Sequence, residues 1–354
     1  MNTAATSTQP AYEVVYGDVR EHRDAFLEVC RRGRDDQARF VAKYDWFYRS
    51  CPWGEPQLCL LRVGADGPFV GAAAIGRRPM FLDGRPIRAG VLVDLVVDAG
   101  HRSLGPALLL QREMLASALD EFDFVYGFPN PKAVRVVTRV GYSMLDDIVR
   151  CSRVLRHASY LQRMLPSPLA RACGAMLDTT DRCIDALREL VRGRLASEWR
   201  DDVDPRMQEL WEKAAPAAGL AGSKDVRGVA WRFAASSAQH ARYLLVSRHE
   251  GGPLEAWFAC QGLGPVLQVR DFWSVGGNRA MSRAAILALI RAARSAGYSV
   301  VSVECTASSP VHASWRRAGF SERGRRPIVG AWSPRLGVGK GAIAVHLTSG
   351  DEDE

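Results

Sequence analysis

The chain repeats itself, and this internal repeat constrains its fold more than any other feature. Adding 185 to residue numbers of the first half reproduces features of the second: Trp46 matches Trp231, Leu60 matches Leu245, and Asp66-Gly67-Pro68 matches Gly251-Gly252-Pro253. The offset falls to 177 where Asp94 matches Asp271 and Arg102 matches Arg279, and is 178 where Gly141-Tyr142 matches Gly319-Phe320. Spacings shared over this length predict two copies of one α/β unit.

The chain length agrees with two units, since 354 residues are long for one hydrophobic core. We expect a disordered tail at 1–11, a first domain at 12–157, a helical connector at 158–195 and a second domain at 196–348. The last residues, 349–354, read Ser-Gly-Asp-Glu-Asp-Glu and predict an exposed acidic tail.

Within the first domain, apolar runs and turn signals predict a mixed sheet flanked by helices. Strands are expected at 12–16, 57–63, 69–76, 78–82, 85–90, 124–128 and 149–155, with helices ending near 32, 119 and 140. Asp83-Gly84 is a strong signal for a two-residue hairpin, and Asn130 and Gly141 are expected to cap the helix between them. The predicted fold class is α/β (α+β), with two such domains in tandem.

The stretch Val91–Leu110 predicts a phosphate-binding site. It begins as an apolar strand interrupted by Asp94, turns at Arg102, and enters a helix whose first residue is expected to be Pro106. A strand that leads through such a turn into a helix presents free backbone N–H groups in one concavity, which suits a phosphate or pyrophosphate.

Composition narrows the class of protein. The formal charge is +8, but only five residues are Lys and 42 are Arg, scattered rather than gathered in a stripe with aromatic residues; we therefore expect no nucleic-acid partner. The eight cysteines form no CxxC pair and no metal-ligand spacing, so reduced cysteines and no bound metal are expected. With neither a signal-peptide pattern nor an apolar run of about 18 residues, the expectation is a cytoplasmic protein without a transmembrane helix.

The connector carries an apolar stripe near helical spacing, made of Leu169, Cys173, Met176, Leu177, Cys183, Ile184, Leu187 and Leu190. One interpretation is a packing helix that joins the two domains. The other is a helix on a membrane surface, given the nearby Arg171, Arg182, Arg188 and Arg192. Peripheral membrane contact therefore stays open, and the sequence leaves the oligomeric state undetermined.

At Arg102-x-x-Gly105-x-Ala107, the first copy is similar to the signature of the GNAT superfamily of acyl-CoA N-acyltransferases, usually written Arg/Gln-x-x-Gly-x-Gly/Ala. Asn130-x-x-Ala133 followed by Gly141-Tyr142 resembles the second half of that family's pattern. Both copies cover most of residues 12–348, so the chain resembles a tandem GNAT protein.

The resemblance implies acetyl-CoA or another acyl-CoA as co-substrate. The expected cofactor-binding residues are Val96, Val97, Arg102, Ser103, Leu104, Gly105, Pro106, Ala107 and Asn130. In this reading the N–H groups of the turn hold the diphosphate, and the strand at Val96 and Val97 pairs with the pantetheine amides and polarises the thioester carbonyl. The acceptor amine then attacks directly in a ternary complex.

The acid and base are less defined by the resemblance. Asp94 is either the base, direct or through water, or a structural hydrogen-bonding partner within the strand. Many relatives have a tyrosine seven residues after the Asn130 position to protonate the leaving thiolate, but Val137 stands there. Tyr126 is then the candidate acid, with Tyr142 or unassisted departure as alternatives, and Cys151 allows a covalent route.

In the second copy, Ser282 replaces Gly105 and Ser308 replaces Asn130. This degenerate copy is expected to form one side of the cleft that binds the acceptor, rather than to bind coenzyme A itself. The leading hypothesis is an N-acyltransferase, most simply an acetyltransferase, acting on a small-molecule, sugar or peptide amine. The alternatives are a transferase of cell-envelope or polysaccharide assembly that uses another activated donor, and a non-catalytic protein that binds coenzyme A or regulates.

Overall fold

The repeat in the sequence is also a repeat of structure. The computed structural model describes residues 11–32, 37–162, 164–234, 241–338 and 343–352. The first copy comprises β1 (Tyr12–Gly17), α1 (Arg23–Arg31), α2 (Gln37–Tyr44), β2 (Gln57–Val63), β3 (Phe69–Leu82), β4 (Arg85–Val97), α3 (Leu104–Glu121), β5 (Phe124–Gly127), α4 (Pro131–Val140) and β6 (Ser143–Val154). The predicted N-terminal tail lies, as far as residue 10, outside the described residues.

The second copy follows the same order. It comprises β7 (Ala196–Arg200), α7 (Pro205–Lys213), α8 (Val226–Ala234), β9 (Arg242–Ser247), β10 (Leu254–Leu263), β11 (Val266–Ser274), α9 (Arg283–Ser295), β12 (Val300–Thr306), α10 (Pro310–Arg317) and β13 (Ser321–Trp332). The connector is helical, as predicted, and contains α5 (Ala158–Leu161) and α6 (Ser167–Arg192). Two short strands, β8 (Leu220–Gly222) and β14 (Val345–His346), stand outside the repeat.

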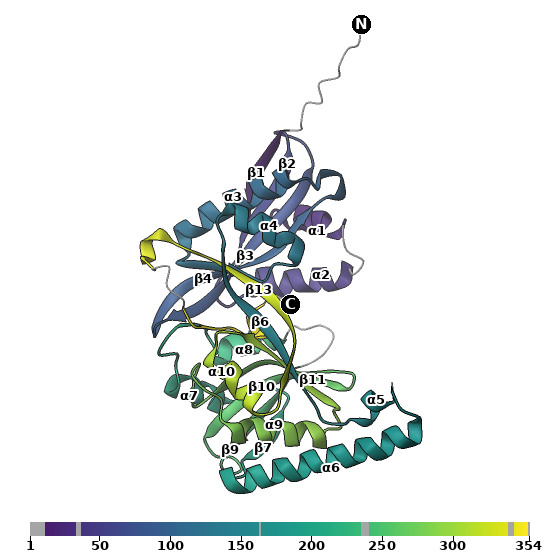
Figure 1. Cartoon of the computed structure of the whole chain (residues 1–354). Coiled ribbons are helices and arrows are strands. Elements are labelled where there is room, and N and C mark those ends of the chain that lie inside the picture. The colour runs from purple at the N-terminus through teal and green to yellow at the C-terminus, as the bar shows by residue number, and fades with distance from the viewer. Residues whose placement is uncertain (1–10, 33–36, 163, 235–240, 339–342, 353–354) are drawn as a thin grey trace.

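The two copies exchange their last strands within one continuous sheet. The strand order is β1-β2-β3-β4-β5-β13-β6-β12-β11-β10-β9-β7, so β13 of the second copy pairs with β5, and β6 of the first copy pairs with β12. Figure 1 shows the first copy above the second, with β6 and β13 crossing between them. The sheet therefore does not divide at residue 157 as predicted, because each half is completed by a strand of the other copy.

A pair of tryptophans lies where the copies meet. The rings of Trp46 and Trp231 stack with their centroids 4.9 Å apart. Each indole N–H donates to the backbone carbonyl of the other residue, Trp46 at 2.9 Å and Trp231 at 3.4 Å. Equivalent residues that bond to each other reciprocally are the mark of a two-fold relation, which supports the repeat inferred from their 185-residue separation.

The predicted hairpin at Asp83-Gly84 is confirmed, but it joins longer strands than expected. Both residues have positive φ (47° and 79°), as a type I′ turn requires. The segments predicted as separate strands on each side are continuous, and β3 and β4 pair from Leu82↔Arg85 to Gly71↔Val97. The second copy lacks this extension and turns at Gly264.

The C-terminal prediction is wrong for residues 349–352, because this segment is buried rather than exposed. The buried Lys224 donates to the Asp351 carboxylate at 2.8 Å, and Arg326 donates to the Glu352 carboxylate, also at 2.8 Å. The acidic run is buried because basic side chains neutralise it. Asp353 and Glu354 lie outside the described residues.

All eight cysteines are free thiols, and five of them are buried, in agreement with the sequence prediction.

No helix among the described residues is long and apolar enough to cross a membrane.

Candidate functional site

Strand β4 carries a bulge at Asp94. Val93 pairs with Ala74 and Val96 with Ala72, so two residues of β4 face one residue of β3. Asp94 has a positive φ of 50°, which a non-glycine residue adopts only when its surroundings hold it there. The bulge turns the backbone of β4 just before its end.

The carboxylate of Asp94 is almost completely buried and already has two partners. Lys43 Nζ lies 3.0 Å from one oxygen, and the Tyr48 hydroxyl donates to the other at 3.0 Å. These contacts join the bulge to α2 and to the π-helical turn Asp45–Arg49 that follows it. They satisfy the buried charge, and they also occupy the oxygen atoms that a general base would use.

Beyond the bulge, β4 separates from β5. The two strands pair in parallel only from Ala89↔Phe124 to Val91↔Tyr126, whereas β4 continues to Val97 and β5 ends at Gly127. Among the described strands, none pairs with the edge of β4 between Leu92 and Val97 that faces away from β3. This edge is open to an extended ligand that carries amides.

The open edge leads directly to the N-terminus of α3. This helix begins at Leu104, so Pro106 is its third residue and not its first as predicted, although it still lies in the turn where no N–H partner is needed. The Ser103 side chain makes no capping hydrogen bond. A Cβ added to Gly105 would meet no atom within 4 Å, so the space beside it is open.

The set of N–H donors at this helix end is smaller than the sequence predicted. The N–H groups of Arg102 and Ser103 are used inside the turn, on the carbonyls of Ala99 and His101. Pro106 has no N–H group, and Ala107 is the first residue placed to bond within the helix, to Ser103. Among the predicted phosphate-binding residues from Arg102 to Ala107, only Leu104 and Gly105 therefore keep N–H groups without a partner in the turn or the helix.

Two other predicted cofactor residues have structural roles. Arg102 is exposed, and its Nε donates to the Val97 carbonyl at 2.9 Å, which leaves the terminal nitrogens beside the end of β4. Asn130 caps α4, because its Oδ1 accepts from the N–H groups of Lys132 and Ala133 at 3.0 Å. This confirms the predicted cap and leaves only the amide NH₂ of Asn130 for a ligand.

The second copy closes both features that the first copy leaves open. At the start of α9, the Ser282 hydroxyl caps the helix by accepting from the Ala285 N–H at 3.1 Å. Strands β11 and β12 separate after Val269↔Val303, and the C-terminal segment fills the gap. Its hydrogen bonds join Leu347 to Thr306, Thr348 to Asp271, and Ser349 to Arg270.

The tyrosines proposed as acids are buried. Tyr126 on β5 donates its hydroxyl proton to the Asp351 carbonyl at 3.0 Å. Tyr142 lies in the apolar core under α3 and α4, where burial raises the pKa of its hydroxyl. Burial therefore disfavours a charged phenolate at Tyr142, and the hydroxyl proton of Tyr126 is engaged by a backbone carbonyl.

Cys151 lies 3.5 Å from His312 Nε2, a pairing that the sequence did not reveal. Burial raises the pKa of the Cys151 thiol to about 11 and lowers the pKa of His312. At neutral pH the thiol is protonated and the imidazole is neutral, which is the opposite of an activated cysteine nucleophile.

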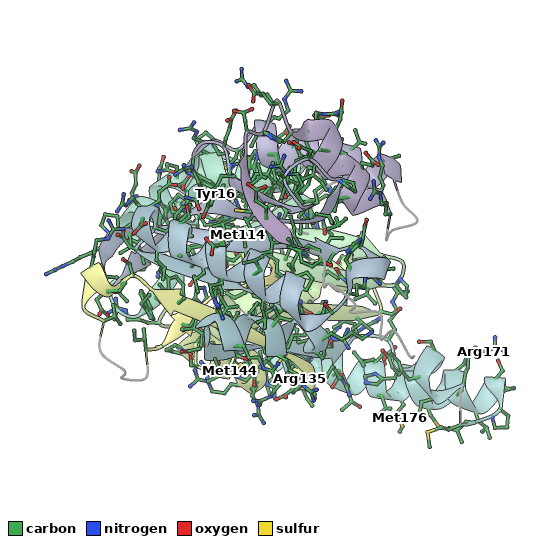
Figure 2. The ribbon with its side chains drawn as sticks, turned by 90° about the horizontal axis from the view of Figure 1, so that it is seen from above. Tyr16, Met114, Arg135, Met144, Arg171 and Met176 are labelled. Carbon is green, nitrogen blue, oxygen red and sulfur yellow. The ribbon has the colours of Figure 1, made fainter. Side chains whose placement is uncertain are left out.

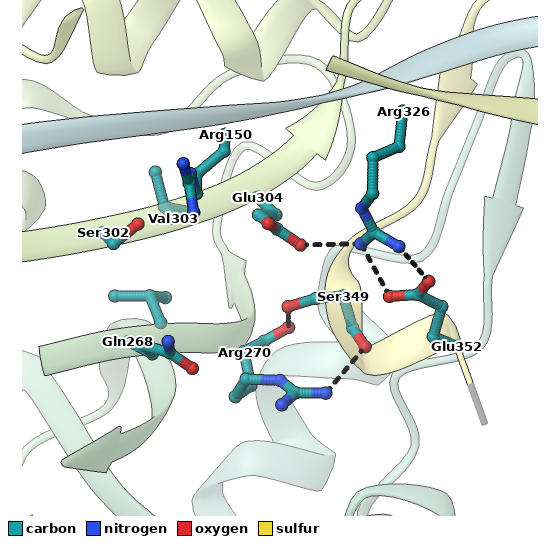
Figure 3. Close-up of a pocket in the computed structure, with 10 residues that line it drawn as sticks. Arg150, Gln268, Arg270, Ser302, Val303, Glu304, Arg326, Ser349 and Glu352 are labelled. Atoms are coloured by element: carbon teal, nitrogen blue, oxygen red, sulfur yellow. Dashed lines mark hydrogen bonds and ion pairs between the residues drawn. The ribbon is translucent and has the colours of Figure 1, made fainter. Parts of the chain in front are cut away.

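The pocket in Figure 3 lies on the second half of the sheet and has a volume of about 270 Å³. Gln268 and Arg270 on β11 line it where the 177 offset puts Val91 and Val93 in the first copy. Arg326 pairs with both Glu304 and Glu352 in its wall. The sheet face that is apolar core in the first copy is thus a polar pocket in the second.

Sequence reasoning missed the partners of the two strand aspartates. Asp94 pairs with Lys43, and its counterpart Asp271 pairs with Lys224 at 2.9 Å. The scarcity of lysine was the available signal, because these are two of only five lysines in a chain rich in arginine.

Among the described residues, no three His, Cys, Asp or Glu side chains converge as metal ligands.

No protein-family model and no curated protein sequence matches the chain. Solved structures match it in fold. A GCN5-related N-acetyltransferase from Kribbella flavida aligns with a TM-score of 0.60 and 15% identity, over 93% of this chain and 72% of its own. N-myristoyltransferase of Saccharomyces cerevisiae with bound myristoyl-CoA aligns at 0.53 and 11%, over 92% and 84%.

A tandem GNAT protein from the clavulanic acid biosynthesis pathway aligns with a TM-score of 0.51 and 11% identity, over 91% of this chain and 99% of its own. At these identities the likeness is one of architecture. The chain therefore has the fold of the GCN5-related N-acetyltransferases, in a tandem form, as the sequence predicted.

Proposed function

We propose that the chain is an acyl-CoA-dependent N-acyltransferase whose donor binds to the first copy alone. One contrast carries this proposal: the first copy has an uncapped helix α3 beside an open strand edge, and the second copy has Ser282 and the C-terminal segment in the equivalent places. Strand bulges and uncapped helix ends persist where a ligand uses them.

In the proposed complex, the diphosphate of the donor lies at the start of α3. The N–H groups of Leu104 and Gly105 and the positive end of the helix dipole attract it, the Ser103 hydroxyl is free to donate, and the terminal nitrogens of Arg102 add charge. Gly105 and the small Ala107 keep the surface close to the backbone. The pantetheine amides then pair with β4 near Val96 and Val97, which brings the thioester to the bulge.

The chemistry proposed is direct transfer. A backbone N–H of β4 near the bulge polarises the thioester carbonyl, and the acceptor amine attacks the carbonyl carbon. The C–N bond forms as the C–S bond breaks, and the proton lost by the nitrogen passes through solvent to the released thiolate of coenzyme A. Because Lys43 and Tyr48 occupy the Asp94 carboxylate, we assign Asp94 to holding the bulge rather than to removing the amine proton. Because Tyr126 donates to Asp351, the thiolate is proposed to leave without it, as its ordinary pKa of about 8.5 permits.

The donor is most simply acetyl-CoA and the acceptor a small-molecule, sugar or peptide amine. Cytoplasmic action fits the eight free thiols. The alternative of a non-catalytic protein that binds coenzyme A makes a different prediction. Such a protein would bind the coenzyme but would release no free thiol with any amine.

The test is calorimetric titration of the full chain with acetyl-CoA, followed by Gly105→Glu. An added side chain at Gly105 meets open space, so the variant is expected to fold. At a separation of about 6 Å and an effective dielectric of about 20, the added carboxylate and one phosphate charge repel by about 3 kcal/mol, which is roughly 100-fold in affinity for each phosphate charge.

Leu263→Glu, at an exposed site on the second copy, is the matched control and should bind like the wild type. Failure of acetyl-CoA and of longer acyl-CoAs to bind the wild-type chain would refute the proposal. Unchanged binding by Gly105→Glu would refute the site.

A further inference from the structure

Helix α6 is turned with its polar side toward the protein. The residues it buries include Asp185, which pairs with Arg153 at 2.8 Å and with Arg294 at 2.8 Å on the body. Asp178 accepts from His157 at 2.8 Å, and Glu189 pairs with Arg291. A surface helix ordinarily buries its apolar stripe, and this one instead buries its acidic side.

The opposite side of α6 is apolar and exposed. Leu169, Met176, Leu187 and Leu190 are 56%, 66%, 63% and 83% exposed, and at 100° per residue they lie on the side away from Asp185. Met164 continues the stripe before the helix at 85% exposure. Figures 1 and 2 show α6 projecting beyond the body of the molecule, with Arg171 and Met176 far from the sheet.

The charge left facing solvent along this helix is mainly basic. Three of its four acidic residues are paired with body residues, whereas Arg171, Arg182 and Arg192 are exposed. Arg182 and Arg188, each three positions from Asp185, lie about 60° to either side of it around the helix and so border the buried face, where Arg188 also pairs with Asp185 at 3.5 Å. The 26 residues of α6 give a rod of roughly 39 Å that is apolar outward, with its exposed arginines on the polar half behind the stripe.

We propose that α6 docks the protein onto the surface of a phospholipid bilayer that contains anionic lipids. The apolar stripe enters the interface between headgroups and acyl chains, and the exposed arginines above it contact lipid phosphates. A second copy of the chain fits the same face less well. Two such helices would bring their exposed arginines close together, and Asp185 and Glu189, which could otherwise pair with them, are already bound to their own body.

The test is co-sedimentation of the full chain with vesicles of phosphatidylcholine alone and of phosphatidylcholine with 30% phosphatidylglycerol. Binding is expected to the anionic vesicles and to weaken as salt is raised. Leu187→Gln/Leu190→Gln removes two exposed side chains and should weaken partitioning at least tenfold. Leu263→Gln, 53% exposed on the body, is the control and should bind normally.

Arg171→Gln/Arg182→Gln should weaken binding to the anionic vesicles about fivefold for each arginine, whereas Arg135→Gln on α4 should not. The same variants are examined by light scattering and by titration with acetyl-CoA. A wild-type chain that fails to bind anionic vesicles overturns the proposal, and a dimer that Leu187→Gln/Leu190→Gln dissociates assigns the face to a second copy instead. Equal binding to both vesicle types overturns the role of the arginines. The acetyl-CoA titration reports on the first copy separately.

Discussion

The buried ion cluster around Lys224 is expected to be a major stabilising feature of the second copy. Its Nζ lies 2.9 Å from Asp271 and 2.8 Å from Asp351, and the three side chains are 1%, 5% and 8% exposed. Burial lowers the pKa of Lys224, but the two carboxylates outweigh burial and raise the pKa above its ordinary value. The lysine is therefore charged at neutral pH and holds the C-terminal segment against β11.

Lys224→Met keeps much of the side-chain volume and removes the charge. Two carboxylates then share a buried site with no cation, a situation that costs about 3–5 kcal/mol. Because the exchanged strands tie the two copies into one sheet, we expect them to unfold together. With about 0.7 kcal/mol/K of unfolding entropy for 354 residues, a loss of about 4 kcal/mol lowers Tm by about 5 °C.

The pH dependence of this loss gives a second check. Burial raises the pKa of Asp271 even in the presence of Lys224, and removing the lysine raises that pKa further. A carboxyl whose pKa is higher in the folded state binds its proton more tightly there, so folding is favoured as the pH falls toward that value. The deficit of Lys224→Met should therefore shrink between pH 7 and pH 5.

The measurement is urea or thermal unfolding of both proteins across this pH range. Lys213→Met is the matched control, since Lys213 makes an exposed pair with Glu209 at 4.0 Å and should cost less than about 1 kcal/mol. A deficit for Lys224→Met below about 1 kcal/mol at pH 7, or one that grows on acidification, would show that the cluster does not act as a charged unit.

Three further outcomes follow from single features. Ser282→Ala removes the cap of α9 and should cost about 1 kcal/mol in urea unfolding while acetyl-CoA titration stays unchanged; weakened acetyl-CoA binding would place the donor in the second copy. Burial lowers the pKa of His346 to about 3, so the native state excludes a proton that the unfolded chain takes up below about pH 6.5. Wild-type stability should then fall by about 1.4 kcal/mol per pH unit below that point, and a His346→Asn profile with the same slope would contradict this origin. A fragment 12–157 lacks β13 beside β5 and β12 beside β6, so circular dichroism should find no cooperative unfolding in it.

The features predicted well from sequence are those set by local chemistry. Strand β2 spans Gln57–Val63 as predicted, α4 lies between Asn130 and Gly141, and the turn at Asp83-Gly84 has the expected backbone. Each depends on neighbouring residues, through a side-chain cap, a glycine with positive φ or a run of apolar residues.

The features that sequence could not supply depend on distant partners. β6 and β13 carry equivalent patterns, so nothing local indicates which copy's fifth strand each will join. Residues 349–352 read as a solvated acidic tail until Lys224 and Arg326 are known to lie beside them. Asp94 was recognised as unusual within its strand, but whether it acts as a base depends on Lys43 and Tyr48, which come from 46 residues or more away.

The strand exchange also gives the second copy a structural role beside the proposed donor site of the first copy. β5 forms one wall of the gap beside β4, and its other edge is completed by β13, from Val329↔Gly127 to Trp332↔Phe124. The Asp351 carbonyl, from the end of the same copy, holds the Tyr126 hydroxyl on β5. An open gap needs rigid walls, because the ligand must enter without the strands closing on each other. The second copy therefore supports the proposed donor site of the first copy from behind, and that role places no demand on its own helix cap or strand gap.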